Sequence, residues 1–106
     1  MARAVKRGVQ ERLIEAELVA RVRALGGIAE KVQAIGRRGF FDRLVILPGG
    51  RIFFVEVKRP YGGRLSPHQI WYLKEFDALG VAIAVVRNSA DITRLLAAAT
   101  EKGPGV

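Results

Sequence analysis

The spacing of apolar residues changes several times along this chain, and each change predicts a new element of secondary structure. From about residue 9 to residue 25 the apolar residues recur with the period of a helix, and Gly26-Gly27 predicts where that helix ends. Shorter apolar runs predict three strands, at about 28–35, 40–47 and 51–58. The turn Pro48-Gly49-Gly50 contains the glycines that tight turns require, so we expect the second and third strands to form a hairpin.

The second half of the chain predicts a helix, a strand and a final helix. Ser66, Pro67 and Gln69 form an S-x-x-Q capping box with proline at the first helical position, and that helix should run to about Leu79. The continuous apolar run at 81–88 is typical of a strand buried on both faces, and Ser89 begins a last helix that should reach about Glu101. The order α-β-β-β-α-β-α predicts one α/β domain over residues 1–106, with a mixed sheet flanked by helices. Residues 1–8 are expected to be a flexible basic arm, and residues 102–106 a flexible tail.

The charge and composition of the chain narrow the possible partners and cofactors. There are 18 Lys and Arg residues against 10 Asp and Glu in 106 residues, an excess that favours a polyanion, either nucleic acid or an anionic membrane surface. The absence of cysteine and the single histidine leave only carboxylates as metal ligands, and carboxylates suit Mg²⁺ or Mn²⁺. There is no signal-peptide pattern and no run of the ~18 apolar residues that a membrane span needs, so we expect a cytoplasmic protein.

Three ionisable residues, Asp42, Glu56 and Lys58, interrupt the apolar strands of the predicted hairpin. Side chains alternate along a strand, so Glu56 and Lys58 share one face. In a hairpin that turns at residues 48–50, position 42 lies roughly opposite positions 56–58, so the three groups can converge. The alternative is a salt bridge between Asp42 and Lys58 across the strands, with Glu56 in solvent.

Two further polar residues fall on apolar faces of the predicted helices. Glu15 lies within the apolar stripe of the first helix, where a buried carboxylate requires a cation, a metal or a position at the edge of the helix that reaches water. Gln69 shares a helix face with Tyr72 and Phe76, so it is expected to face the sheet. It is either the capping partner of Ser66 or a group that orients a phosphate or a water near Glu56, and both interpretations stay open.

The spacing of these residues resembles that of the VRR-NUC family, part of the PD-(D/E)xK superfamily of metal-dependent nucleases. The resemblance rests on Glu15, Gly39-Phe40-Phe41-Asp42, Val55-Glu56-Val57-Lys58 and Leu65-Ser66-Pro67-His68-Gln69, and it spans nearly the whole chain. The element order also agrees with the restriction-endonuclease-like core of that superfamily. One position departs from the family pattern, because Phe41 stands where the family usually has proline before its catalytic aspartate.

The resemblance implies hydrolysis of phosphodiester bonds with Mg²⁺ or Mn²⁺. Asp42, Glu56 and the backbone carbonyl of Val57 are then expected to bind the metal, and Glu15 to complete the ligand shell directly or through water. Lys58 would orient the attacking water or stabilise the developing charge, and Gln69 is a further candidate. Basic residues on turns and strand ends are expected to contact DNA phosphates: Arg37, Arg38, Arg43, Arg59 and Arg64.

Stand-alone members of the family resemble Holliday junction resolvases in size, which implies a homodimer acting on branched DNA in a bacterial or phage-infected cell. The hairpin and Trp71-Tyr72 are candidate interface elements. One alternative is a non-catalytic nucleic-acid-binding protein on a decayed nuclease fold. The other is an unrelated basic α/β interaction domain whose charges form only salt bridges.

Overall fold

The computed structural model describes residues 7–33 and 40–101 of the chain. Its elements are α1 (Arg7–Ala24), β1 (Ile28–Lys31), β2 (Arg43–Leu47), β3 (Arg51–Val57), α2 (Pro67–Ala78), β4 (Ile83–Val86) and α3 (Ser89–Glu101). The predicted order of elements is therefore confirmed. The strands are shorter than predicted, and α1 begins inside the segment that was expected to be a flexible arm. The rest of that arm, the basic turn at 36–39 and the tail at 102–106 lie outside the described residues.

The strands form a four-stranded sheet in the order β1-β2-β3-β4. The first three strands pair antiparallel, and β4 pairs parallel to β3. Gly49 and Gly50 take φ angles of 90° and 79° in the β2–β3 turn, which is the conformation that favours glycine there. Within this register Arg43 lies opposite Val55, so the residue before β2 meets the carboxyl end of β3.

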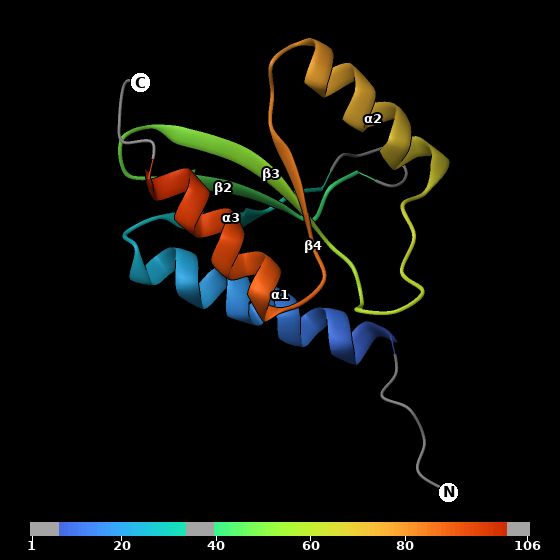
Figure 1. Ribbon diagram of the computed structural model, residues 1–106, viewed down its shortest axis with the longest axis horizontal. Coiled ribbons are helices and arrows are strands. Elements are labelled where there is room, and N and C mark those ends of the chain that lie inside the picture. The colour runs from blue at the N-terminus through green and yellow to red at the C-terminus, as the bar shows by residue number, and fades with distance from the viewer. Residues whose placement is uncertain (1–6, 34–39, 102–106) are drawn as a thin grey trace, which may run out of the picture.

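Helices cover the two faces of the sheet unequally (Figure 1). Helices α1 and α3 lie side by side on one face, where Leu18, Val22, Ile92 and Leu96 pack in a core with alternate residues of β2 and β3. Helix α2 lies apart from this pair and packs Phe76 against Phe54, which points to the opposite face. The α1–α3 pair thus covers one face of the sheet, while Phe54 and Glu56, at alternate positions of β3, point to the other face.

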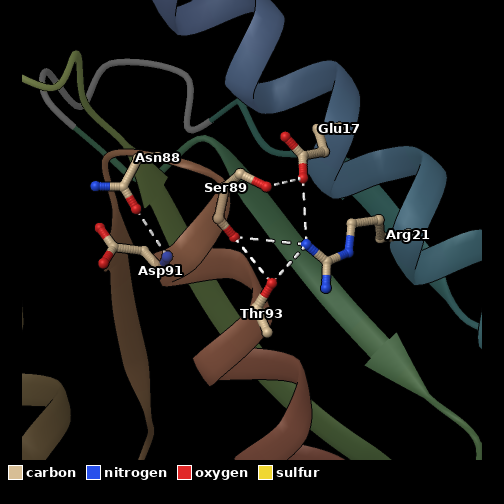
Figure 2. A network of polar contacts seen from close by, with 6 residues as sticks. All are labelled: Glu17, Arg21, Asn88, Ser89, Asp91 and Thr93. Carbon is tan, nitrogen blue, oxygen red and sulfur yellow. Dashed lines mark hydrogen bonds and ion pairs between the residues drawn. The ribbon is translucent and has the colours of Figure 1, made fainter.

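Helix α1 is fixed to α3 by a polar network around Glu17 (Figure 2). The Oε2 atom of Glu17 accepts a hydrogen bond of 2.5 Å from the Ser89 hydroxyl and lies 3.2 Å from Nη1 of Arg21. The same Arg21 nitrogen donates to Oγ1 of Thr93 at 2.9 Å. The hydrogen bond from Ser89 lowers the pKa of Glu17 below its ordinary value, so the carboxylate stays charged in this network. Glu17 therefore contacts α3, on a different side of α1 from Glu15.

Two burial predictions are wrong. Strand β4 is the edge of the sheet and not a strand buried on both faces, and of its residues only Val86 is buried. The apolar residues of β4 contact α3 on one face and β3 along one edge, and they do not require a central position in the sheet. The helical period of the sequence also places Leu25 on the apolar face of the first helix, with Leu18 and Val22. In the structure Leu25 lies just beyond the end of α1 and is 42 % exposed. No helix in the described ranges combines the length and the hydropathy needed to cross a membrane.

Candidate active site

Asp42 lies at a bend just before β2 and is held against the carboxyl end of β3. Its Oδ2 atom accepts a hydrogen bond of 2.8 Å from the backbone N–H of Val57. Its own carbonyl accepts a bond of 3.0 Å from the N–H of Val32. These contacts place the carboxylate beside the E-x-K segment of β3, as the hairpin register predicts.

Glu56 is buried, with only 3 % of its surface exposed, and its two carboxylate oxygens differ in their surroundings. Oε2 lies 3.0 Å from Nζ of Lys58, whereas Oε1 is buried and has no hydrogen-bond partner among residues 7–33 and 40–101. The alternative in which Lys58 bridges to Asp42 and Glu56 lies in solvent is therefore wrong. An unpartnered buried carboxylate oxygen is costly, which indicates that a further group belongs beside it.

The site has more negative charge than its own residues neutralise. Burial raises the pKa of Glu56 to about 7, and the nearby Asp42 carboxylate raises it in the same direction, against the opposing effect of Lys58. Burial also raises the pKa of Asp42, partly opposed by its hydrogen bond from Val57, while the Glu15 carboxylate adds to the rise. Both carboxyl groups are thus electrostatically suited to a cation.

Gln69 is the capping partner of Ser66, one of the two interpretations that its position in the sequence left open, and it also lies close to Glu56. Its Oε1 atom accepts a bond of 3.1 Å from the N–H of Ser66, and the Ser66 hydroxyl accepts one of 3.1 Å from the N–H of Gln69, which completes the capping box. The side chain is 4 % exposed, and its amide also lowers the pKa of Glu56. Because Oε1 is bonded to Ser66, the Nε2 amide is the end that is left for Glu56. The cap therefore orients Gln69 toward the site.

Glu15 forms an ion pair with Arg43. A cation was one of the partners expected for a carboxylate within the apolar stripe of the first helix. Nε of Arg43 lies 2.6 Å from Oε2 of Glu15, and Nη1 donates to the carbonyl of Ala29 at 2.9 Å. Both side chains are about four-fifths buried, with 20 % and 19 % of their surfaces exposed. The Arg43 guanidinium, predicted to contact DNA, thus has its contacts inside the protein. Glu15 is close enough to raise the pKa of Asp42, but it is directed at Arg43.

The predicted DNA-contacting arginines have different surroundings. Arg59 donates within its own loop, from Nε to the carbonyl of Tyr61 at 2.7 Å and from Nη2 to that of Gly62 at 2.9 Å. Arg64 is exposed. Arg37 and Arg38 lie outside the described residues.

Sequence reasoning missed Arg87, which lies just beyond β4. Its Nη1 atom donates to the carbonyl of Gly63 at 2.5 Å and to that of Arg59 at 3.5 Å. The sequence feature that could have indicated Arg87 is its position as a cation directly after the apolar strand β4.

The carboxylate oxygens at the site are ligands of the type that divalent cations such as Mg²⁺ prefer. In the part of the chain that the structure describes, no group of three or more Asp, Glu or His side chains is arranged to hold a metal. The candidates that converge are the Asp42 and Glu56 carboxylates, and both are hard oxygen ligands. The unpartnered Oε1 atom of Glu56 is the observation that fits a missing cation.

Phe41 is part of an aromatic cluster that connects the segment before β2 to α2. It is 1 % exposed, and its ring centroid lies 5.5 Å from that of Phe40, 6.1 Å from that of Tyr72 and 6.3 Å from that of Phe54. The residue that stands in place of the family's proline is therefore a core residue. Tyr72 also belongs to this core, whereas Trp71 is 54 % exposed.

The fold and the arrangement of Asp42, Glu56 and Lys58 define a class, the restriction-endonuclease-like proteins with a PD-(D/E)xK core. No model of a protein family matches the chain. The chain is 45 % identical over 90 residues to the protein named "Putative nuclease p44" of Acyrthosiphon pisum secondary endosymbiont phage 1, covering 85 % of this chain and 95 % of that protein. It is also similar to a solved structure described as "VRR_NUC domain", with a TM-score of 0.78 and 36 % identity over 82 % of this chain and 94 % of the other. The chain belongs to the VRR-NUC family.

Proposed function

We propose that the protein is an Mg²⁺- or Mn²⁺-dependent endonuclease that hydrolyses phosphodiester bonds in DNA. The observation that carries the proposal is Glu56, which lies beside Asp42. One oxygen of this buried carboxylate contacts Lys58, and the other has no partner in the part of the chain that the structure describes. A purely structural ion pair would not require a second buried carboxylate at the same place. Membership of the VRR-NUC family supports the same reaction.

Asp42, Glu56 and the backbone carbonyl of Val57 are the groups that would hold the metal. Glu15 would join them by leaving Arg43, or would act through water. When bound, the metal supplies Lewis-acid stabilisation of the phosphate charge and lowers the pKa of a water.

Lys58 and Gln69 would act on the charge and the geometry around these ligands. Lys58 is 17 % exposed and its ammonium lies beside the Glu56 carboxylate, so it can orient the attacking water or stabilise the charge that develops on the phosphate. Gln69 would keep Glu56 in place through an amide whose other end is fixed by the helix cap.

The expected substrate is DNA, with a branched or junction structure preferred. The net charge of +8 favours binding to phosphates. Of the predicted phosphate contacts, Arg64 is exposed, and Arg37 and Arg38 lie outside the described residues. A homodimer would present two sites to two strands of a junction. Ile52 and Trp71 are the exposed large apolar residues of the predicted interface, at 57 % and 54 %. Light scattering of the purified protein tests for the dimer.

Cleavage is tested with labelled four-way junction, flap, linear duplex and single-stranded DNA, each with Mn²⁺ and with EDTA. We expect cleavage that requires the metal and is lost in Lys58→Ala while binding is retained. Lys74→Ala removes the same charge from an exposed position on α2 and should cleave normally. Binding of every substrate without cleavage by the unmutated protein would favour the non-catalytic alternative.

A further inference from the structure

A hollow lies next to the candidate active site and is lined in part by Lys58. Its volume is about 500 Å³, and it is lined by Glu11, Lys58, Arg59, Gly62, Gly63 and Arg64. Half of these residues are cations and only Glu11 is an acid. Because Lys58 also contacts Glu56, the hollow and the candidate active site share this side chain.

The loop of residues 59–64 that forms the hollow is braced from two directions. From inside, the Arg59 guanidinium bonds to the carbonyls of Tyr61 and Gly62. From outside, Arg87 donates to the carbonyls of Gly63 and Arg59. The loop carbonyls that would repel an anion are therefore turned toward guanidinium groups, which leaves the loop with excess positive charge.

Glycine is required in this loop for its shape. Gly62 has a φ angle of +74°, which side chains rarely adopt. A Cβ atom at Gly63 would lie 3.1 Å from both Cγ and the carbonyl oxygen of Arg59 and 3.2 Å from its nitrogen. The loop thus folds closely around Arg59, and a side chain at Gly63 would displace it.

We propose that this hollow binds the backbone phosphate next to the one that is cleaved. The inference rests on the proposed function, since it takes the cleaved phosphate to lie at Asp42 and Glu56. Successive phosphates of one strand are about 3.4 Å apart along a duplex axis, so a phosphate at Lys58 has a charged neighbour close by. Arg64 contacts this neighbour, and Arg59 and Arg87 are positioning residues that hold the loop in shape. Binding to a preformed loop avoids the entropic cost of ordering it.

The test uses a four-way junction with a single neutral methylphosphonate stepped along one strand, because the branch point fixes the register of binding. Affinity is measured in EDTA, so no cleavage is needed, and the cleaved bond is mapped separately with Mn²⁺. We expect one methylphosphonate, adjacent to the cleaved bond, to weaken binding about ten-fold. In Arg64→Ala the same methylphosphonate should have no effect, and the slope of log affinity against log salt should fall by about 0.9.

Three variants separate charge from shape. Arg23→Ala is the control, because it removes an exposed arginine near the end of α1, ~18 Å along the helix from Glu11. This variant should keep the methylphosphonate effect and the slope of log affinity against log salt of the wild type. Gly63→Ala displaces the loop without changing any charge, so it should weaken binding and abolish the position-specific effect. Glu11→Gln removes the acid from the lining and should strengthen binding.

The outcomes distinguish this inference from the proposed function. If Arg64→Ala leaves the methylphosphonate profile unchanged while the wild type cleaves with Mn²⁺, the hollow is not a phosphate site and the nuclease proposal stands. If the profile shows an Arg64-dependent phosphate but no DNA is cleaved, the hollow binds phosphate and the nuclease proposal fails. An Arg64-dependent phosphate that is distant from the mapped cleavage would overturn the assignment to the neighbouring nucleotide.

Discussion

Replacing Glu56 by glutamine should make the metal-free protein more stable above pH 7. Burial raises the pKa of this side chain from 4.5 to about 7, so the folded state binds its proton more tightly than the unfolded chain does. The stability of the wild type should therefore fall as the pH rises from about 4.5 to about 7. Glutamine resembles the protonated acid in shape and has no charge at any of these pH values.

The size of the effect follows from the shift in pKa. Each pKa unit corresponds to about 1.4 kcal/mol, so ionising Glu56 destabilises the folded protein by about 3 kcal/mol at pH 8 and by less than about 1 kcal/mol at pH 5. The attraction of Lys58 is already contained in the pKa and does not need to be subtracted. For a chain of this length, about 3 kcal/mol is a rise in melting temperature on the order of 10 °C.

The assay is chemical and thermal denaturation followed by circular dichroism, in EDTA at pH 5 and pH 8. Glu75→Gln is the matched control because it removes the same charge from an exposed position on α2. The control should change stability little at either pH. Mn²⁺ should then stabilise the wild type, by about 2.7 kcal/mol at 100 times its dissociation constant, and should stabilise Glu56→Gln much less.

Two results would refute this reasoning. A stability gain that is equal at pH 5 and pH 8 would mean that the glutamine improves packing and that Glu56 is not an uncompensated carboxylate. An equal stabilisation of both proteins by Mn²⁺ would place the metal away from Glu56.

Four other substitutions, at three positions, test the residues that support the site. Phe41→Ala should lower the free energy of unfolding, measured by urea denaturation, by about 3–5 kcal/mol. Phe41→Pro also removes the buried ring, so it should be destabilised by a similar amount and should not cleave DNA faster than the wild type. Arg43→Met leaves Glu15 without its cation and should destabilise the metal-free protein by about 1–3 kcal/mol. In thermal melts, Mn²⁺ should then stabilise this variant more than it stabilises the wild type. Ser66→Ala should lower stability by about 1 kcal/mol, measured by urea denaturation.

Local signals in the sequence were sufficient for most of the fold. The capping box at Ser66, the glycine turn after β2 and the helical period of α1 depend on residues close together in the chain, and each is confirmed. The position of β4 at the edge of the sheet was not predictable in this way. Its burial depends on which strands and helices lie beside it, and an apolar run looks the same in a central strand and in an edge strand covered by a helix.

The convergence of Asp42, Glu56 and Lys58 was predictable because a hairpin links register to sequence. With the turn fixed at residues 48–50, alternation decides which side chains share a face. The partner of Glu15 was not predictable, since Arg43 is 28 residues away and reaches it from another element. An arginine at the start of a strand has the same pattern whether it binds DNA or an internal carboxylate, and only the packing of α1 against the sheet distinguishes the two.

The absence of proline before Asp42 is compensated by contacts from three sides. Proline would restrict the backbone there by fixing φ. In this chain the buried ring of Phe41 anchors the preceding residue, the Asp42 carbonyl bonds to Val32, and the carboxylate bonds to Val57. Val57 belongs to the core face of β3, while Glu56 points to the other face. The Phe41 ring, the Asp42 carbonyl and the Asp42 carboxylate are thus each held by a separate contact, and these contacts fix the segment in the absence of proline.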